Sequence, residues 1–313
     1  MNKKVVVLGG GTGMSVLLQG LKKFPLDITA IVSVSDDGSS TGKLREEFNT
    51  PAVGDIRRVL ISLSETEPLV EKLFNYRFKT CSDLDGHTVG NLILTAAKEI
   101  TGNLSDGIEA FSKVFNLKGK VVPLTEDNVV LMAKMEDGSI VEGEHHITES
   151  PKKIKEVFYK EEPIVTPESI EAIKNSDAII LSMGSVYTSI IPNLITKEII
   201  NAIDNSSAKI MYVCNMVTQP GETEGFKVSD HINLLNSYLG KRKIEYVLAN
   251  DKKIDENILK RYQTTEQKDQ VILDKENLNN VKLIEDNYFT VIDNIVRHDA
   301  LKLAFNIFTE VFK

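Results

Sequence analysis

Three loops within the first 58 residues have compositions that suit phosphate binding, and the first of them is rich in glycine. An apolar run at 3–8 leads into it, and a helical pattern with Val16, Leu17 and Leu21 follows. A strand that ends in glycines and opens a helix leaves backbone N–H groups unpaired at the positive end of the helix dipole, where a phosphate fits. Glycines also let a ligand approach the backbone closely. We therefore predict a phosphate or pyrophosphate site, rather than a turn that binds nothing, at Gly9, Gly10, Gly11, Thr12 and Gly13.

This loop matches neither of two common nucleotide-binding fingerprints. Counted from Gly9 or Gly11, the third glycine of the dinucleotide pattern would fall on Met14 or Val16. The P-loop lysine is also missing, because Met14 follows the last glycine directly. Binding of NAD or FAD and P-loop nucleotide chemistry are therefore disfavoured.

The second loop follows an apolar run at 28–34 and carries two acids and two serines, namely Asp36, Asp37, Ser39 and Ser40. In a dinucleotide fold, an acid at this distance from the glycines would hold a ribose hydroxyl. Together with the serines, the two acids could instead hold a hydrated Mg²⁺ or a sugar. The alternative is an Asx turn that caps the next helix.

Two further loops open helices and offer charged or amide side chains. Gly54, Asp55 and Arg57 lie in the first. Asp55 is predicted to cap its helix, and either Arg57 or the arginine after it to reach a phosphate, since the two project about 100° apart. In the second, His87 and Asn91 are four residues apart and share one helical face. His87 either binds a ligand, transfers a proton or makes a structural hydrogen bond.

The second half of the chain adds two polar loops, each after an apolar run. The loop after 178–181 is a second candidate anion site, with Gly184, Ser185, Tyr187, Thr188 and Asn193. Because no G-x-S-x-G pattern is present, Ser185 is not assigned as a nucleophile. The loop after 209–214 offers hydrogen bonds to a base or sugar, or is a polar surface loop, with Asn215, Thr218 and Gln219.

The composition excludes several classes of protein. The 313 residues are 42% hydrophobic and 26% charged, with a formal net charge of −8, which argues against a general nucleic-acid or anionic-membrane surface. Cys81 and Cys214 are the only cysteines and suggest neither a disulfide framework nor a zinc site. The chain shows no signal peptide and no long apolar span, so we expect a cytoplasmic protein without membrane insertion.

Strand and helix patterns alternate along most of the chain. Strands are predicted at 3–8, 28–34, 178–181, 209–214, 244–248 and 281–284, each followed by a turn and helical periodicity, which indicates a parallel α/β sheet. Residues 119–148 break this rhythm with short antiparallel strands around the turn Asp137-Gly138. The polar segment 150–176 is expected to lead back to the sheet. We predict one domain over residues 1–313, with 119–148 as a β insertion.

Taken together, the loops at 9–15, 35–40, 54–57, 86–91, 184–193, 214–223 and 297–299 resemble the YvcK-type gluconeogenesis factors (UPF0052) of the CofD-like superfamily. The resemblance implies a Rossmann-like, mostly parallel sheet with helices on both faces. It also implies a cytosolic bacterial protein that binds UDP-sugars, notably UDP-N-acetylglucosamine, and supports gluconeogenic growth, cell-envelope synthesis and cell shape. Tyr262 and Arg297, which the pattern alone would place on the surface, match positions tied to the nucleotide-sugar site.

More distant relatives are 2-phospho-L-lactate transferases, which use a guanylylated phospholactate and Mg²⁺. The glycine-rich loop and the Asp36-Asp37 region correspond loosely to theirs, whereas residues 184–223 resemble the YvcK branch. We therefore expect a regulator that binds a nucleotide sugar, and keep a Mg²⁺-dependent transferase as the alternative. A homodimer and an unidentified protein partner are also expected, with no nucleic acid.

Overall fold

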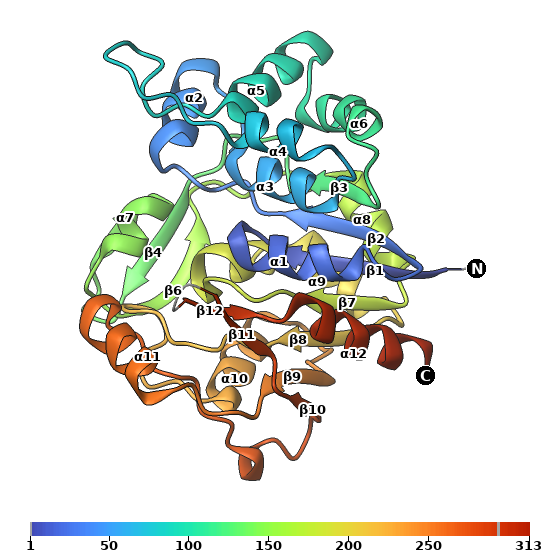
Figure 1. Cartoon of the computed structure of the whole chain (residues 1–313), viewed down its shortest axis with the longest axis vertical. Helices are drawn as coiled ribbons and strands as arrows, with labels where there is room; N and C mark the ends of the chain where they lie inside the picture. Colours follow the sequence, from blue (N-terminus) through green and yellow to red (C-terminus); the bar gives the residue numbers. More distant parts are fainter. Residues whose placement is uncertain (1, 293–294) are drawn as a thin grey trace.

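A seven-stranded parallel sheet forms the centre of the computed structural model, which describes residues 2–292 and 295–313 (Figure 1). Its strand order is β10-β9-β8-β7-β1-β2-β3. The strands are β1 (Lys3–Gly9), β2 (Leu26–Val32), β3 (Lys120–Pro123), β7 (Ala178–Leu181), β8 (Lys209–Val213), β9 (Tyr246–Asn250) and β10 (Lys282–Asp286). Every strand predicted for this sheet is present, with ends that shift by at most two residues.

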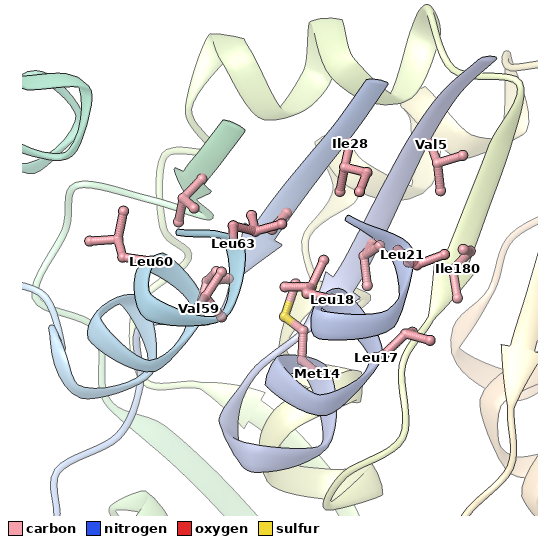
Figure 2. Close-up of a cluster of buried hydrophobic side chains, with 14 of the residues drawn as sticks. Val5, Met14, Leu17, Leu18, Leu21, Ile28, Val59, Leu60, Leu63 and Ile180 are labelled. Carbon is pink, nitrogen blue, oxygen red and sulfur yellow. The ribbon is translucent and has the colours of Figure 1, made fainter. Parts of the chain in front are cut away.

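The central strands are buried on both faces. In β1, Val5 and Val7 belong to one hydrophobic cluster, whereas Val6 and Leu8 belong to the other. Because successive side chains of a strand point to opposite faces, a continuous apolar run needs helices on both sides of the sheet. Figure 2 shows the first cluster, in which Met14 and neighbouring helical residues lie against the strands.

Helices cover both faces of the sheet. The first cluster includes residues of α1 (Gly11–Leu21), α3 (Gly54–Leu63) and α12 (Ala300–Phe312), and the second includes residues of α8 (Pro167–Lys174), α9 (Lys197–Asp204) and α10 (Val228–Tyr238). A Cβ on Gly20 would collide with the carbonyl oxygen of Ala300. The backbones of helices α1 and α12 are therefore in direct contact at Gly20, where no side chain would fit between them.

A helical lobe lies between β2 and β3 in the sequence and sits above the sheet in Figure 1. It contains α2 (Ser39–Phe48), α4 (Pro68–Asn75), α5 (Val89–Thr101) and α6 (Leu104–Val114). Phe74 of α4 makes ring contacts with Phe111 and Phe115, which joins α4 to α6.

The predicted β insertion has different bounds in the structure. A separate antiparallel sheet has the order β5-β4-β6, from β4 (Leu131–Met135), β5 (Ile140–Glu142) and β6 (Ile154–Tyr159), with α7 (Glu144–Glu149) between β5 and β6. Strand β3 pairs parallel with β2 and so belongs to the main sheet. Its Pro123 is tolerated because β3 is an edge strand. Strand β6 lies in the polar segment that was expected only to lead back to the main sheet. Only Ile154 and Val157 of this strand are buried, so it has no clear apolar pattern.

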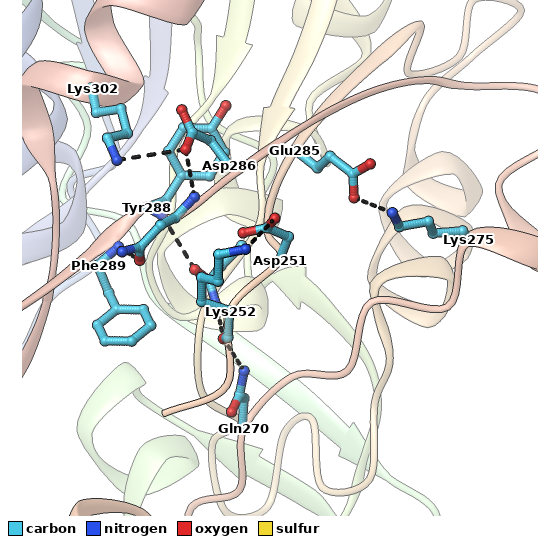
Figure 3. A network of polar contacts seen from close by, with 11 residues as sticks. Asp251, Lys252, Gln270, Lys275, Glu285, Asp286, Tyr288, Phe289 and Lys302 are labelled. Carbon is cyan, nitrogen blue, oxygen red and sulfur yellow. Dashed lines mark hydrogen bonds and ion pairs between the residues drawn. The ribbon is translucent and has the colours of Figure 1, made fainter. Parts of the chain in front are cut away.

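The C-terminal part adds a hairpin that the sequence pattern missed. Strands β11 (Phe289–Ile292) and β12 (Ile295–His298) pair antiparallel, and α12 begins only after Asp299, whose carboxylate caps it by accepting from Lys302 N–H. Before the hairpin come α11 (Glu256–Arg261) and η3 (Tyr262–Glu266). In Figure 3, Lys302 of α12 reaches Asp286 at the end of β10, which anchors the chain that enters the hairpin.

Candidate functional site

Most of the predicted site residues lie in loops at one edge of the parallel sheet. The glycine-rich loop follows β1, the acidic loop follows β2, and the loops at 184–193 and 215–219 follow β7 and β8. These four strands are adjacent in the sheet, so their carboxyl ends meet at a common edge. Figure 1 shows α2, α7, α11 and the β11–β12 hairpin around this edge.

Packing explains three of the four glycines of the first loop. A Cβ on Gly9 would strike the Ser182 hydroxyl, and one on Gly13 would strike the carbonyl oxygen of Met183. A Cβ on Gly10 would collide with the carboxylate of Asp55. Gly11 differs, because a Cβ there would meet nothing closer than 3.9 Å, but its φ of +66° favours glycine. The glycines therefore let the loop press against β7 and α3, a reason that the sequence did not reveal.

The N-terminus of α1 opens toward the edge of the sheet. Gly11 N–H donates to the carboxylate of Asp55 at 2.6 Å. The next two N–H groups, of Thr12 and Gly13, have no hydrogen-bond partner among the described residues. Thr12 is exposed. Two unused donors at the positive end of a helix form an anion-binding corner.

Asp55 was predicted to cap its own helix, and this prediction is wrong. The N-cap of α3 is Val53, without a side-chain bond, and the Asp55 carboxylate bonds instead to Gly11 of α1 and to Arg58 at 2.6 Å. Burial raises the pKa of Asp55, against the opposing effect of Arg58. Gly54 allows close contact, because a Cβ there would lie 2.6 Å from the Thr41 hydroxyl oxygen.

The acids of the second loop are used by the fold. Asp36 accepts a hydrogen bond from Gly38 N–H at 3.0 Å, which is the predicted Asx turn. Asp37 accepts from His145 N–H at 2.8 Å and so caps α7. Within residues 2–292 and 295–313, no three His, Cys, Asp or Glu side chains are arranged to hold a metal ion. The predicted metal ligands Asp36 and Asp37 therefore have no third His, Cys, Asp or Glu side chain, among the described residues, with which to hold a metal ion.

Four predicted residues form one hydrogen-bonded chain. The Ser40 hydroxyl lies 3.0 Å from His87 Nδ1 and accepts from the Asn91 amide at 3.2 Å. Asn91 in turn accepts from Arg57 Nε at 2.9 Å. All four side chains are buried, whereas Ser39 is exposed and has a φ of +45°. The structure thus joins the second, third and fourth predicted loops through side chains.

The loop after β7 is held by partners from the loop after β8. The Asn215 amide accepts from Gly184 N–H at 3.0 Å and donates to its carbonyl at 2.7 Å. The Ser185 hydroxyl lies 2.7 Å from a Glu222 carboxylate oxygen, and Thr188 donates to Ser185. These bonds orient the loop backbone and leave Asn215 with both amide groups occupied.

Three other predicted residues also have structural partners. Asn193 donates to the carbonyl of Ser189 at 2.9 Å and is fully buried. Tyr187 is buried among the apolar residues of the second cluster, so its ring is part of the core. Thr218 exchanges hydrogen bonds with Asp269, while the side-chain oxygen of buried Gln219 has no partner among the described residues.

Sequence reasoning missed three charged side chains of this edge. Glu144 bonds to Thr188, and its pKa is raised to about 7 by burial and by the nearby Asp36. Glu222 holds Ser185, and burial raises its pKa. Arg45 donates to the carbonyl oxygens of Ser35 and Asp36 at 3.0 Å. Glu222 lies within the loop 214–223, which contributes to the family resemblance, whereas Glu144 and Arg45 have no local signal in the sequence.

Tyr262 and Arg297 lie close together. The Tyr262 hydroxyl accepts from Val296 N–H at 3.0 Å, and Arg297 is the next residue of β12. Arg297 is exposed, but the Tyr262 ring is buried, with the Arg261 guanidinium 5.8 Å from its centre. His298 approaches the Cys214 carbonyl oxygen at 3.3 Å, and burial lowers its pKa to about 4. The hairpin is therefore tied to the end of β8.

Comparison with known families identifies the family to which the chain belongs. The family model described as 2-phospho-L-lactate transferase CofD matches residues 5–289, which include every predicted site residue except Arg297. The chain belongs to this family. The predicted membership of the CofD-like superfamily is thereby confirmed.

Relatives at high identity extend over nearly the whole chain. A gluconeogenesis factor of Bacillus subtilis is 46% identical over 304 residues, which cover 96% of each protein. A gluconeogenesis factor of Halalkalibacterium halodurans is 44% identical over 311 residues, covering 96% of this chain and 94% of the relative. The crystal structure of a UPF0052 family member from Bacillus halodurans has a TM-score of 0.94 at 43% identity, and covers 98% of this chain and 99% of its own. The predicted Rossmann-like α/β fold is confirmed.

No helix within the described ranges is both long enough and apolar enough to span a membrane.

Proposed function

We propose that this protein binds a nucleoside diphosphate sugar of the UDP-N-acetylglucosamine type at the carboxyl edge of its sheet and acts as a regulator. The observation that carries the proposal is the open N-terminus of α1, where the N–H groups of Thr12 and Gly13 have no partner among the described residues. A diphosphate supplies the anion that this corner lacks.

Arg297 supports a second contact to the same ligand. Its side chain is exposed on β12, in a hairpin fixed to the end of β8 through His298. A guanidinium can grip phosphate oxygens with a planar fork. Contacts from α1 and from β12 would therefore hold one ligand from two sides of the edge.

The biological role is inferred from relatives. Gluconeogenesis factors at 44–46% identity support a role in growth on gluconeogenic carbon. Cytoplasmic location and links to cell-envelope synthesis and cell shape complete the proposal, with a homodimer and a protein partner through which the bound state is transmitted.

A transferase is the second candidate, and the family model supports it. In that case a phospholactyl group would move from a nucleotide-activated donor, with Mg²⁺ near Asp36 and Asp37. Both side chains already accept backbone hydrogen bonds, so a metal ion would use their remaining oxygen atoms. The residues present can thus supply carboxylate oxygens, which Mg²⁺ prefers.

Calorimetric titration separates the candidates. The purified protein is titrated with UDP-N-acetylglucosamine, UDP-glucose, GDP, GTP and NADH, with and without Mg²⁺. The regulator predicts preference for UDP-sugars and no consumption of ligand after prolonged incubation. Preference for a guanine nucleotide, or transfer of a phospholactyl group, would favour the transferase, and binding of NADH alone would refute both.

A further inference from the structure

Arg57 is a buried cation without a carboxylate partner. Its side chain is 6% exposed, and its guanidinium donates to the amide oxygens of Asn91 and Asn75. Within the described parts of the chain, no acid lies within ion-pair distance of it. A buried charge that has only neutral partners is costly, so a protein usually supplies a compensating charge.

The charged groups nearest to Arg57 do not remove this cost. Burial lowers its pKa to about 10, and Arg58 and Arg77 add to the effect, so Arg57 is a cation beside two other cations at neutral pH. Asp55 and Asp36 act in the opposite direction. However, Asp55 already pairs with Arg58 and Gly11, and Asp36 with Gly38.

The buried Arg45 provides an instructive contrast. Its guanidinium donates to Asn128 and to backbone carbonyl oxygens, including those of Ser35 and Asp36. Burial lowers its pKa, and the carboxylates of Asp37 and Asp36 oppose this effect. The charged neighbours of Arg45 thus favour its cationic form, whereas Arg58 and Arg77 disfavour that of Arg57.

Neutral donors surround the same place. The Ser40 hydroxyl accepts from Asn91 and lies 3.0 Å from His87 Nδ1, to which it donates or from which it accepts, depending on the imidazole tautomer. Burial lowers the pKa of His87, with Lys43 and Arg77 adding to the effect. A neutral His87 that accepts through Nδ1 carries its proton on Nε2 and remains a donor there. Arginine with hydroxyl, imidazole and amide groups is a donor set for phosphate oxygens.

This cluster is separate from the glycine-rich loop. Positions 55 and 57 of a helix point about 200° apart. Asp55 faces Gly11, whereas Arg57 contacts Gly90 of α5, where a Cβ would lie 2.6 Å from its Cδ. Arg57 therefore points away from the side of α3 that contacts Gly11.

We propose that Arg57, with Arg77, Ser40, His87 and Asn91, forms a second anion subsite, which takes the phosphate group of a small metabolite or free phosphate. The subsite lies between α2, α3 and α5, on the helical lobe. It is independent of the nucleotide-sugar proposal, since its ligand is bound on the opposite side of α3 from the N-terminus of α1.

Thermal unfolding and calorimetry with inorganic phosphate and with glycerol 3-phosphate test this subsite. Potassium chloride at equal ionic strength is the reference. At least one probe should raise the Tm of the parent beyond the chloride reference, because a ligand that binds only the folded state stabilises it. Its affinity should fall at least tenfold in Arg57→Gln and severalfold in Arg77→Gln. Arg242→Gln is the control, since Arg242 pairs with Glu245 in the loop between α10 and β9 and should leave the affinity unchanged.

The outcomes decide between the alternatives. If neither probe raises the Tm beyond chloride, or if Arg57→Gln binds as the parent does, Arg57 is a structural bridge between Asn75 and Asn91 and the proposal is wrong. Saturating UDP-N-acetylglucosamine should leave the phosphate effect in place, whereas its loss would assign Arg57 to the nucleotide site and also refute a second subsite. If Arg57→Gln does not fold, Arg57→Lys and Arg77→Gln carry the same comparison. Phosphate binding without UDP-sugar binding would refute only the nucleotide proposal.

Discussion

The Tyr262 hydroxyl accepts a hydrogen bond from the backbone N–H of Val296 at 3.0 Å. This contact fixes the segment after α11 to β12, directly beside the exposed Arg297. Since the Tyr262 ring is 5% exposed, its main service to a ligand is to hold the strand that carries Arg297. Stacking of the ring on a base would require it to leave this packing.

This arrangement separates the effects of two substitutions at Tyr262. Tyr262→Ala removes both the ring and the hydroxyl, and we expect UDP-sugar affinity to fall at least tenfold, about 1.4 kcal/mol. Tyr262→Phe keeps the ring and loses only the bond to Val296, so the loss should be smaller. Calorimetry measures both variants. Equal losses for the two would show that the hydroxyl, rather than the ring, contributes the binding energy.

Arg297→Ala should weaken UDP-sugar binding at least tenfold without changing the Tm of the ligand-free protein. The side chain is exposed, so its removal leaves no cavity and no buried unpaired group. Arg261→Ala, at the end of α11, is a matched loss of charge outside β12. Binding within twofold of the parent for Arg297→Ala would remove this residue from the site.

Gly11 tests whether the open end of α1 binds the diphosphate. Gly11→Val forces a β-branched residue to a φ of +66°, so it should lower stability by about 1–2 kcal/mol and abolish binding. Gly11→Asn tolerates this backbone conformation far better, and no atom lies within 3.9 Å of its Cβ. We expect Gly11→Asn to fold almost normally and still bind at least tenfold more weakly. Normal binding by this variant would mean that the loop is only a turn.

Glu144 should make both stability and binding depend on pH. Because burial raises its folded pKa from 4.5 to about 7, this carboxyl favours the folded state when protonated. The contribution is fully present below pH 4.5 and is lost as pH rises through about 7. A nearby diphosphate disfavours the ionised form further, so UDP-sugar affinity should fall between pH 6 and 8 by up to about tenfold. Glu144→Gln should weaken the pH dependence of both the stability and the UDP-sugar affinity. An unchanged pH dependence would show that Glu144 is not the titrating group.

Arg45→Met should destabilise the protein by about 3–5 kcal/mol, since it leaves the buried carbonyl oxygens of Ser35 and Asp36 without their donor. Urea unfolding measures the change. Lys43→Met, an exposed position on the same helix, should change stability by less than about 0.5 kcal/mol. Similar effects for the two variants would show that Arg45 does not clamp the acidic loop.

The sequence predicted well those features that depend on local pattern. The strand 178–181 is present with the predicted bounds, because four consecutive apolar residues suit a strand buried on both faces. Thr88 caps α5 through its hydroxyl, next to the predicted glycine-flanked loop. Loops that follow adjacent parallel strands must share an edge, so their convergence could be predicted without any side-chain geometry.

Features that depend on distant partners could not be predicted. The Asp55 carboxylate bonds to Gly11, which is 44 residues away, and a helix-start acid gives no sign of such a partner. Strand β6 buries too few apolar side chains to stand out, and its pairing with β4 comes from the tertiary structure. For Arg57, the pattern suggested a phosphate contact, but only the structure shows that its neighbours are amides and other cations.

The close contact between Gly20 of α1 and Ala300 of α12 has a consequence for protein synthesis. The first helix of the chain carries the open N–H groups, and Arg297 comes just before the last helix, so the two groups proposed to hold one ligand are made at opposite ends of translation. A nascent chain that ends before β12 has neither the support for α1 nor the arginine. On the proposal that these two groups hold one ligand, unfinished chains that end before β12 would not compete for it.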